Sequence, residues 1–343
     1  MSDGTDIKIL AKVNKMNFSL SAALQMVLNG LQKLMSVVLA ILMSSGQFAA
    51  PPTDEPITAL DPEEVLVTFN VIGDSQVNVM NYNRIYIDLT LQDINNAATK
   101  QDAFMIVGDI TENSLDQEWQ MIREYLNTYN YGENLLLVSG NHDIRLFSAD
   151  QATERFTSFA NEFNDFEIEA QNYTYEINGY TFIVMGSDGY AFEEANISDE
   201  QIEWLDEELA EATEDGKPAF VMMHQPLKNT HGLPLTWGDG NNPNAGHVGK
   251  QSDAIQDVLN DYENVVLITG HLHTGLGQYT YEYTDGIHMV NVPGAGKNNK
   301  DGEYNEFSTG YSVEVYEDEI VFRARDYAKG KYVPEYDITI PVV

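Results

Sequence analysis

Cysteine is absent from the 343 residues of this chain. Disulfide bonds, thiolate metal sites and thiol nucleophiles are therefore excluded, and cysteine gives no indication of the redox compartment. A metal ion, if one is bound, must be held by histidine or by the side-chain oxygens of Asp, Glu, Asn and Gln. That ligand set suits Mn, Fe, Zn or Mg.

Basic residues are scarce. The chain has 18 Lys and Arg against 54 Asp and Glu, which gives a formal net charge of −36. Such a surface repels the phosphates of nucleic acids, so we expect no nucleic-acid partner. An acidic surface also keeps a secreted or salt-adapted protein soluble, so the charge excludes one class without identifying another. The 43% of hydrophobic residues is enough for a sizeable core.

Charge is nearly missing from residues 17–50, where Lys33 is the only charged residue. A basic residue, the apolar run 34–43 and a small-residue exit are typical of a secretory signal peptide. The run is shorter than the ~20 residues of a membrane span. We therefore expect residues 1–50 to be an export signal, which would make the protein secreted or part of the cell envelope. The alternative is a hydrophobic helical segment that associates with a membrane or a partner through residues 17–50. Residues 51–64 are predicted to form a polar linker.

Strands and helices are predicted to alternate after this linker. Short apolar runs predict strands at residues 65–72, 103–107, 135–138, 220–223 and 265–268. Apolar residues at helical spacing predict helices at residues 85–98, 118–126 and 199–212. The alternation favours a layered α/β fold with parallel strands, in which ligands bind beyond the carboxyl ends of the strands.

Other segments indicate antiparallel pairing. Two β-rich runs around Asn178-Gly179 predict a hairpin with a two-residue turn. Ser198 and Gln201 predict a capping box at the start of the third helix. Residues 228–250, rich in Asn, Gly and Pro, are predicted to be a long loop. Four later runs are predicted to be antiparallel strands of a second sheet: residues 278–283, 288–292, 312–315 and 320–324.

Polar side chains follow each of the five strands predicted at residues 65–72, 103–107, 135–138, 220–223 and 265–268. In chain order the clusters are Gly73-Asp74-Ser75-Gln76, Gly108-Asp109, Gly140-Asn141-His142-Asp143, a lone His224, and Gly270-His271-Leu272-His273. Each has an ordinary explanation when it is taken alone, since Gly-Asp after a strand is most often a turn and a lone histidine is often structural. Together they place four of the seven histidines and two Gly-Asp pairs at strand exits. We therefore predict a two-metal centre, in which metals about 3.5–4 Å apart clamp the oxygens of a phosphoryl displacement.

The motif order resembles the calcineurin-like metallophosphoesterase superfamily over residues 66–325. The pattern of that family is Asp-x-His, Gly-Asp, Gly-Asn-His-Asp/Glu, a lone His, and Gly-His-x-His. The resemblance implies a four-layer α-β-β-α sandwich of two mixed sheets, the metallo-dependent phosphatase-like α/β fold, for residues 65–343. One position departs from the pattern, because Gln76 stands where the family usually has His.

The resemblance also implies two divalent or trivalent metal ions. It implies that Asp74, Gln76, Asp109 and His273 hold the first, and that Asp109, Asn141, His224 and His271 hold the second. Because an amide oxygen is neutral and harder than imidazole, Gln76 would favour Mn or Mg over Zn at the first position.

The implied reaction is attack on phosphorus by a hydroxide that bridges the two metals. By resemblance His142 acts as general acid or charge stabiliser at the leaving oxygen, and Glu112 orients His142. Arg145, one of the few basic residues, and His231, in the predicted loop, are candidate substrate-binding residues. A surface arginine and an exposed loop histidine are the alternatives for these two.

These features predict a metal-dependent phosphoesterase that hydrolyses phosphodiester, pyrophosphate or phosphomonoester bonds in a small phosphorylated substrate. Diesters and pyrophosphates are preferred over monoesters, because relatives of the nucleoside-diphosphate and ADP-ribose hydrolase type also carry Gln at the position of Gln76. The alternative is a non-catalytic binding or assembly protein on the same fold, with the N-terminal segment as its interaction element.

Overall fold

The computed structural model describes residues 55–80, 83–189, 193–237 and 246–343. The predicted export segment and the first residues of the predicted linker lie outside this part of the chain. No helix within the described ranges is both long and apolar enough to cross a membrane.

The first sheet is mixed and has seven strands. Its main path runs in the order β12-β11-β10-β1-β2-β3, and β13 pairs with β11. β1, β2 and β3 are parallel to one another, whereas β10 pairs antiparallel with β1. The strands are β1 (Val67–Ile72), β2 (Ala103–Val107), β3 (Asn134–Val138), β10 (Thr309–Val315), β11 (Glu319–Asp326), β12 (Lys331–Tyr332) and β13 (Ile338–Pro341).

The second sheet is also mixed and has six strands in the order β4-β5-β6-β7-β9-β8. β5, β6, β7 and β9 are parallel, and antiparallel hairpins β4–β5 and β8–β9 close the two edges. The strands are β4 (Tyr173–Ile177), β5 (Tyr180–Val184), β6 (Ala219–Met222), β7 (Val265–Thr269), β8 (Tyr281–Thr284) and β9 (Ile287–Asn291).

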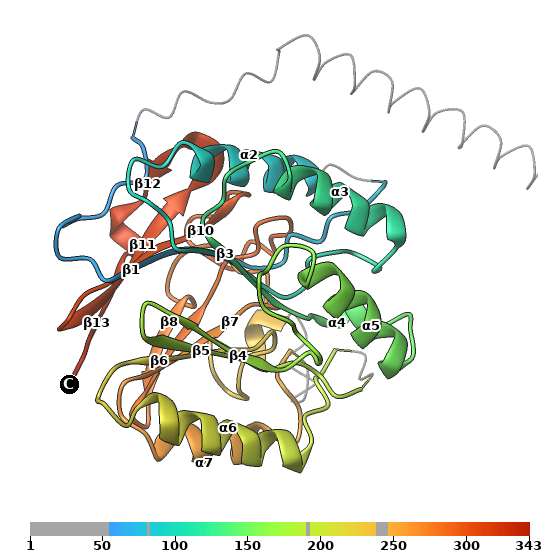
Figure 1. The fold of residues 1–343 in the computed structure, drawn as a ribbon, viewed down its shortest axis with the longest axis vertical. Helices are drawn as coiled ribbons and strands as arrows, with labels where there is room; N and C mark the ends of the chain where they lie inside the picture. The colour runs from blue at the N-terminus through green and yellow to red at the C-terminus, as the bar shows by residue number, and fades with distance from the viewer. Residues whose placement is uncertain (1–54, 81–82, 190–192, 238–245) are drawn as a thin grey trace, which may run out of the picture. The chain divides into compact units, whose positions relative to one another are not determined.

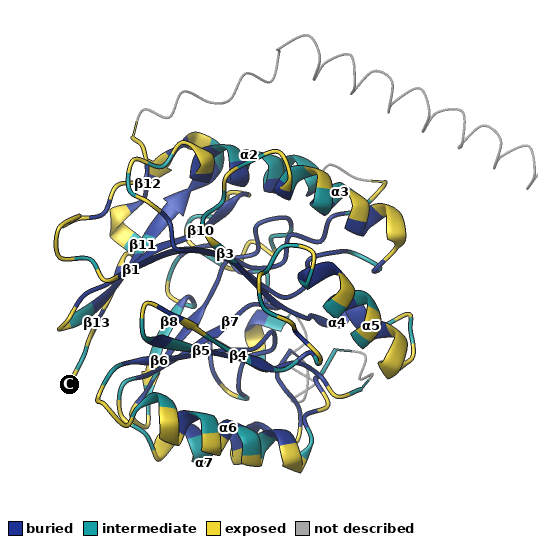
Figure 2. Ribbon diagram, viewed as in Figure 1, coloured by how far each residue is buried: buried dark blue, intermediate teal, exposed yellow. Residues whose placement is uncertain are grey.

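Helices cover the outer face of each sheet, so the described domain has four layers (Figure 1). Helices on the side of the first sheet are α2 (Asn83–Asn95), α3 (Asp116–Leu126), α4 (Asn141–Ile144) and α5 (Ala149–Ala160). Those on the side of the second sheet are α6 (Asp199–Ala212) and α7 (Ser252–Asn260). Short 3-10 helices are η1 (Leu235–Trp237), η2 (Tyr327–Lys329) and η3 (Pro334–Tyr336). Figure 2 shows that the helices bury the face toward the sheets and expose the other. The predicted sandwich of two mixed sheets is therefore confirmed.

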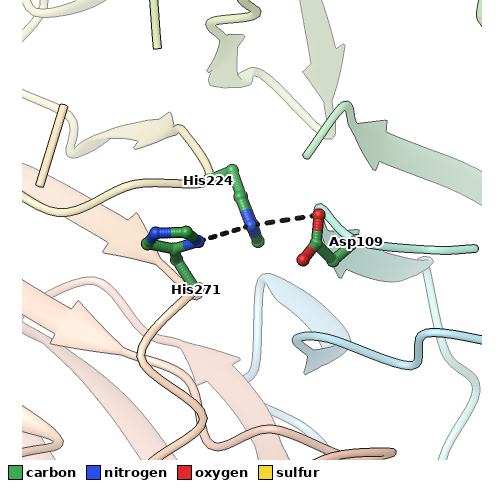
Figure 3. Close-up of side chains that lie close together, drawn as sticks. All are labelled: Asp109, His224 and His271. Carbon is green, nitrogen blue, oxygen red and sulfur yellow. Dashed lines mark hydrogen bonds and ion pairs between the residues drawn. The ribbon is translucent and has the colours of Figure 1, made fainter. Parts of the chain in front are cut away.

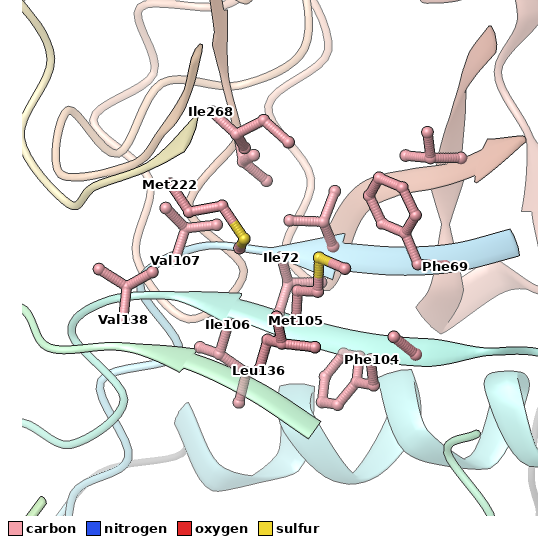
Figure 4. Packing of buried hydrophobic residues seen from close by; sticks show 14 of the residues in the cluster. Phe69, Ile72, Phe104, Met105, Ile106, Val107, Leu136, Val138, Met222 and Ile268 are labelled. Atoms are coloured by element: carbon pink, nitrogen blue, oxygen red, sulfur yellow. The ribbon is translucent and has the colours of Figure 1, made fainter. Parts of the chain in front are cut away.

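The main core lies between the two sheets. Phe69 of β1 packs edge-on against Phe182 of β5 and Phe220 of β6, with ring centroids 5.5 and 5.6 Å apart. Phe182 and Phe220 stack on each other at 4.8 Å. Aromatic pairs of this kind contribute about 0.5–1.5 kcal/mol beyond the area they bury. Figure 4 shows part of this cluster, with Met222 coming from the second sheet. Both sheets are thereby held face to face.

The assignment of the last two predicted strands to the second sheet was wrong. Residues 312–315 and 320–324 fall in β10 and β11, which join the first sheet beside β1. All seven residues of β10 are buried, because β10 has a strand on each side and a layer on each face. The alternation of Tyr311, Val313 and Val315 with Ser312 and Glu314 predicts a strand with one apolar face, but it does not show which sheet that strand joins.

Local predictions were confirmed where short-range physics dominates. Asn178 and Gly179 have φ of 54° and 80°, the left-handed pair that a two-residue hairpin turn needs. The capping box of α6 was half right, because Oγ of Ser198 accepts from the backbone N–H of Gln201. The Gln201 side chain bonds the backbone of Gly186 in both directions instead of the cap. A tertiary contact has replaced the local one.

Residues 55–64 contain no helix or strand but are attached to the domain. Ile57 and Ala59 are buried, and the carbonyl of Ile57 accepts from the backbone of Ala98 and Thr99. The carbonyl of Glu55 accepts from the buried Arg325. This part of the predicted linker therefore lies against the first sheet and α2.

Candidate metal centre

The predicted ligands lie just beyond the carboxyl ends of five parallel strands, three in one sheet and two in the other. Asp74 follows β1, Asp109 follows β2 and Asn141 begins α4 after β3. His224 follows β6, and His271 follows β7. The two sheets face each other, so these ends meet. The backbone N–H of His271 donates to Oδ2 of Asp74 over 3.0 Å, across 197 positions of the sequence.

One group of potential ligands contains Asp74, Asp109 and His273, whose ligand atoms all lie within 4.8 Å of one another. Nε2 of His273 lies 3.2 Å from Oδ1 of Asp74. Gln76 belongs to the same cluster, but its amide nitrogen donates to Oδ2 of Asp109 over 2.9 Å. Gln76 therefore lies where the sequence predicts, with its amide nitrogen toward Asp109. An amide flip exchanges the two ends, and the orientation follows the hydrogen bonds that are available.

A second group contains Asp109, His224 and His271 (Figure 3). Nε2 of His224 lies 3.3 Å from Oδ1 of Asp109 and 3.2 Å from Nδ1 of His271. Asp109 is thus common to both groups, with one oxygen toward each. Two ligand groups that share one carboxylate form the arrangement predicted for a two-metal centre.

The ring of His224 is oriented by its other nitrogen. Nδ1 donates to the carbonyl of Val107, the last residue of β2, over 2.8 Å. That bond leaves Nε2 to face Asp109, which is how a backbone acceptor fixes the tautomer of a metal-binding histidine. The ring of His271 is held differently, by stacking on Trp237 at 4.4 Å between centroids.

The charges of the centre are strongly coupled. Burial opposes protonation of His224, but the carboxylates of Asp109 and Asp74 outweigh it and raise the pKa of His224 to about 9. Burial and the neighbouring His224 push the pKa of His271 well below its usual value. Burial would raise the pKa of Asp109, yet the surrounding histidines hold it far below its usual range. A proton on His224 therefore occupies the position in which a cation would be most stable.

The backbone at the centre is unusual. Five of the seven predicted ligands have a left-handed φ between 39° and 71°: Asp74, Gln76, Asp109, His271 and His273. This region costs a non-glycine residue about 1–2 kcal/mol. Such conformations persist only where the surrounding structure enforces them, and they concentrate at functional sites.

Two glycines of the motifs are required by close packing. A Cβ added to Gly108, which has φ of +80°, would lie 2.2 Å from Nδ1 of His224. A Cβ added to Gly140 would lie 2.1 Å from Oδ1 of Asp109. Glycine therefore precedes the ligands because the side chains from neighbouring strands occupy the space of its missing Cβ.

Asp143 connects the Gly140-Asn141-His142-Asp143 turn to the residues that follow Gly108-Asp109. Its buried carboxylate accepts from the backbone N–H groups of Ile110, Thr111 and Gly140 at 2.9–3.1 Å, and from Oγ1 of Thr111 at 2.7 Å. Burial and the nearby charge of Asp109 raise the pKa of Asp143 to about 6. Its role is structural, since it holds the Gly-Asp and Gly-Asn-His turns together.

His142 lies beside the centre, and its contacts differ from those implied by the resemblance. Nδ1 donates to the backbone carbonyl of Glu112 over 2.8 Å, while Oε1 of the Glu112 carboxylate is 3.5 Å away. Nε2 lies 3.2 Å from Nη1 of Arg145 and 3.7 Å from Oδ2 of Asp109. Glu112 therefore orients His142 through its main chain. Arg145 is fixed by the carbonyl of Glu112 and the side chain of Asn113.

His231 is not an exposed loop residue. Its ring is buried, Nδ1 donates to the carbonyl of Tyr279, and its backbone N–H donates to Oε2 of Glu282. Burial lowers the pKa of His231 to about 4, so the ring is neutral at physiological pH. These contacts give it a packing role beside β8.

Sequence reasoning missed two residues at the centre. Oε2 of Glu193 accepts from the side-chain amide of Asn141 over 3.3 Å, and burial raises the pKa of Glu193. Nζ of Lys297 lies 3.3 Å from Oε2 of Glu112. Glu193 follows no strand and belongs to no motif. Lys297 follows the small-residue run 294–296 shortly after β9, which was the one available signal.

The residues present fit two divalent cations. Asp74 and Asp109 are fully buried and adjacent, and buried carboxylates are costly unless cations compensate them. Within the described part of the chain, the buried Oε1 of Gln76 has no hydrogen-bond partner. Carboxylates, imidazoles and a neutral amide are ligands that Mn, Fe, Zn and Mg accept.

The chain is similar in sequence to a known family. Residues 67–275 match the model of the family described as calcineurin-like phosphoesterase. The match covers more than half of the chain, and all the predicted ligands lie inside it. The chain belongs to the calcineurin-like phosphoesterase family.

The chain is 25% identical over 198 residues to a protein named as a probable glycerophosphodiester phosphodiesterase, GpdQ, of Arcobacter nitrofigilis. The aligned segment covers 56% of this chain and 65% of the relative, slightly less than two thirds of its length.

Solved structures share the fold. A dimetal phosphatase from Danio rerio superposes with a TM-score of 0.55 at 14% identity, covering 82% of this chain and 100% of the other. A purple acid phosphatase, PPD1, from yellow lupin superposes with a TM-score of 0.56 at 13% identity, covering 83% and 55%. At these identities the similarity supports the fold alone.

Proposed function

We propose that this protein is a metal-dependent hydrolase of phosphodiester or pyrophosphate bonds. The observation that carries the proposal is the pair of ligand groups, Asp74–Asp109–His273 and Asp109–His224–His271, that share one carboxylate. With Gln76 and Asn141 beside them, these residues would hold two metal ions. When bound, the ions would supply Lewis acidity toward phosphoryl oxygens and a lowered pKa for water.

The protein's own contribution at the leaving oxygen would come from His142. With Nδ1 donating to the carbonyl of Glu112, only Nε2 can exchange a proton. Nε2 lies 3.2 Å from Nη1 of Arg145 and 3.7 Å from Oδ2 of Asp109, so it faces the proposed phosphate position. From there it would donate a proton to the leaving oxygen, as a general acid does.

Arg145 would bind a non-bridging phosphate oxygen. Its guanidinium is held on one side by the carbonyl of Glu112 and by Asn113, while Nη1 points toward His142. A planar guanidinium offers several donors in fixed directions, which suits a phosphate with two free oxygens. The proposed role follows from this position between the reacting site and the surface.

Diesters and pyrophosphates are preferred over monoesters for two reasons. Gln76 replaces the usual histidine of the family. The resemblance implies that relatives with Gln at this position hydrolyse diester or pyrophosphate bonds. The aligned relative in Arcobacter nitrofigilis carries the name of a diester hydrolase.

The test begins with metal analysis of the purified protein. Kinetics then follow with p-nitrophenyl phosphate, bis(p-nitrophenyl) phosphate and pyrophosphate-linked nucleotides, each with Mn²⁺, Mg²⁺, Zn²⁺ or chelator. We expect about two metals per chain and chelator-sensitive diester hydrolysis. Metal binding without turnover of any of these compounds would favour the alternative, a non-catalytic binding or assembly protein.

Export or membrane association through the N-terminal segment remains a proposal. It is supported by the nearly uncharged, apolar composition of residues 17–50. Mass-spectrometric mapping of the mature N-terminus in cell fractions would test it. An intact N-terminus in the cytoplasmic fraction would contradict export.

A further inference from the structure

Two basic side chains converge on one carboxylate beside the metal centre. Oε1 of Glu112 lies 3.5 Å from Nη2 of Arg145, and Oε2 lies 3.3 Å from Nζ of Lys297. In a chain with three times as many acidic as basic residues, two cations at one point are an unusual concentration. Glu112 thus holds Arg145 and Lys297 apart, one at each oxygen.

Lys297 is placed by the same backbone that places the ligands. Two residues nearby tie its loop to the centre: Gly296 donates its N–H to the carbonyl of Asp74 over 2.9 Å, and Asn299 donates to the carbonyl of His273 over 2.8 Å. The loop also packs closely, since a Cβ added to Gly296 would lie 2.1 Å from the carbonyl oxygen of Ser75. The Cα of Lys297 is therefore fixed relative to the predicted ligands, while its side chain stays 38% exposed and open to an incoming molecule.

A short path links Lys297 to the shared carboxylate. Glu112 contacts Lys297 at 3.3 Å and His142 at 3.5 Å, and His142 lies 3.7 Å from Asp109. Arg145 lies on the His142 side of Glu112, next to the proposed leaving oxygen. Lys297 lies on the other side of Glu112, so the carboxylate of Glu112 separates it from Arg145. This spacing provides a second cation for a group adjacent to the reacting phosphate.

We propose that Lys297 is a specificity-determining residue that binds negative charge on the substrate beyond the reacting phosphate. The inference rests on the proposed phosphodiesterase or pyrophosphatase function and narrows its substrate class to pyrophosphate-linked compounds over singly charged diesters. The reacting phosphate takes the metals and Arg145, and the neighbouring phosphate takes Lys297. In the free protein Glu112 pairs with both Arg145 and Lys297, so neither cation is left unpaired. When substrate binds, both cations would also contact phosphate.

The charge of the substrate provides the test. Bis(p-nitrophenyl) phosphate carries one negative charge, and UDP-glucose carries two on adjacent phosphates. We expect Lys297→Met to raise KM for UDP-glucose about tenfold, as for one lost charge-assisted contact, with kcat within about twofold. Kinetics with bis(p-nitrophenyl) phosphate should change by less than about twofold, because its single charge is met by groups that remain. Lys297→Arg should restore most of the affinity, since it retains the charge.

Lys300→Met is the matched control. Lys300 is an exposed residue of the same loop with no described contact to Glu112. Its substitution by Met removes the same charge from the protein as Lys297→Met does. It should leave both substrates unaffected, which separates a local contact from a change in net charge. Metal content and thermal unfolding of all three variants should match the wild type.

The outcomes separate this inference from the function on which it rests. If the wild type binds UDP-glucose without cleaving it, the same difference is read from its inhibition constant against bis(p-nitrophenyl) phosphate. An equal effect of Lys297→Met on both substrates, or none on either, would overturn the inference. So would a wild type that hydrolyses bis(p-nitrophenyl) phosphate but neither binds nor cleaves UDP-glucose at 10 mM, about the top of the useful range. A wild type that cleaves neither diester nor pyrophosphate bonds would instead overturn the proposed function.

Discussion

Nδ1 of His142 lies 2.8 Å from the backbone carbonyl oxygen of Glu112 and 3.5 Å from the carboxylate of the same residue. The carbonyl is fixed by the chain, whereas the carboxylate is drawn toward Lys297 and Arg145. The tautomer of His142 is therefore set by the main chain, and a substitution of the Glu112 side chain should preserve it.

This contact predicts different outcomes for two substitutions. His142→Ala should lower kcat for bis(p-nitrophenyl) phosphate by about 10²–10⁴-fold, the usual contribution of a general acid. Glu112→Gln should lower it by less than about tenfold, because the carbonyl still accepts from Nδ1. Steady-state kinetics at fixed metal concentration compare them. Equal losses would show that the carboxylate, not the carbonyl, orients the imidazole.

Substitutions of Asp109 and of His142 should separate metal binding from proton transfer. Asp109→Asn removes the carboxylate common to both ligand groups, so we expect loss of both metals and of activity. His142→Ala should retain metal, because His142 is adjacent to the centre but belongs to neither group. Inductively coupled plasma mass spectrometry after dialysis measures the content. A His142 variant as depleted as the Asp109 variant would make His142 a ligand.

Metal affinity should rise with pH. Without metal, the pKa of His224 is raised to about 9, so a cation must displace its proton at pH 7. Affinity should then increase up to about tenfold per pH unit below 9. Mn²⁺ titrations at pH 6, 7 and 8 in buffers of different ionisation enthalpy would show the displaced proton. His288→Gln, outside both ligand groups, should leave the slope unchanged, and a flat profile would contradict the assignment.

Gly108 should be intolerant of a side chain. Gly108→Ala places a Cβ 2.2 Å from the His224 ring, so we expect overpacking to cost about 1–3 kcal/mol and to weaken metal binding. Gly216→Ala is the control, since Gly216 has the same φ of +80° but no atom within 4 Å of the added Cβ. Urea unfolding of both variants isolates the steric contact from the backbone cost. Equal destabilisation would mean that His224 simply moves aside.

His231 should make stability depend on pH. Its pKa is lowered from 6.5 to about 4 by burial, so the unfolded chain binds a proton between these values that the folded chain excludes. Stability from this group is therefore complete above pH 6.5 and falls toward pH 4, by roughly 3 kcal/mol in all. In His231→Asn, where Asn tolerates the φ of 50° and can donate to the Tyr279 carbonyl, that part of the dependence should vanish. Parallel slopes for both proteins from pH 7 to 4 would contradict this account.

The sequence by itself determined the family, the sandwich of two sheets and the strand ends at which the predicted ligands lie. The clusters that contain them begin within a few residues of the end of a short buried strand, and a strand end is a local feature that an apolar run and a glycine reveal. The order of Asp74, Asp109, His224 and His271 along the chain could be read because parallel strands bring their carboxyl ends to one edge.

The tertiary structure alone decided which groups meet across that edge. β10 pairs with β1, some 240 residues away, and β11 pairs with β10, and the alternating pattern of these strands encodes neither partner. The carbonyl of Glu112 reaches His142 ahead of its carboxylate, and Lys297 arrives from a loop after β9. Such contacts depend on loop paths and side-chain directions fixed only when the two sheets pack, because short-range patterns carry no information about distant neighbours.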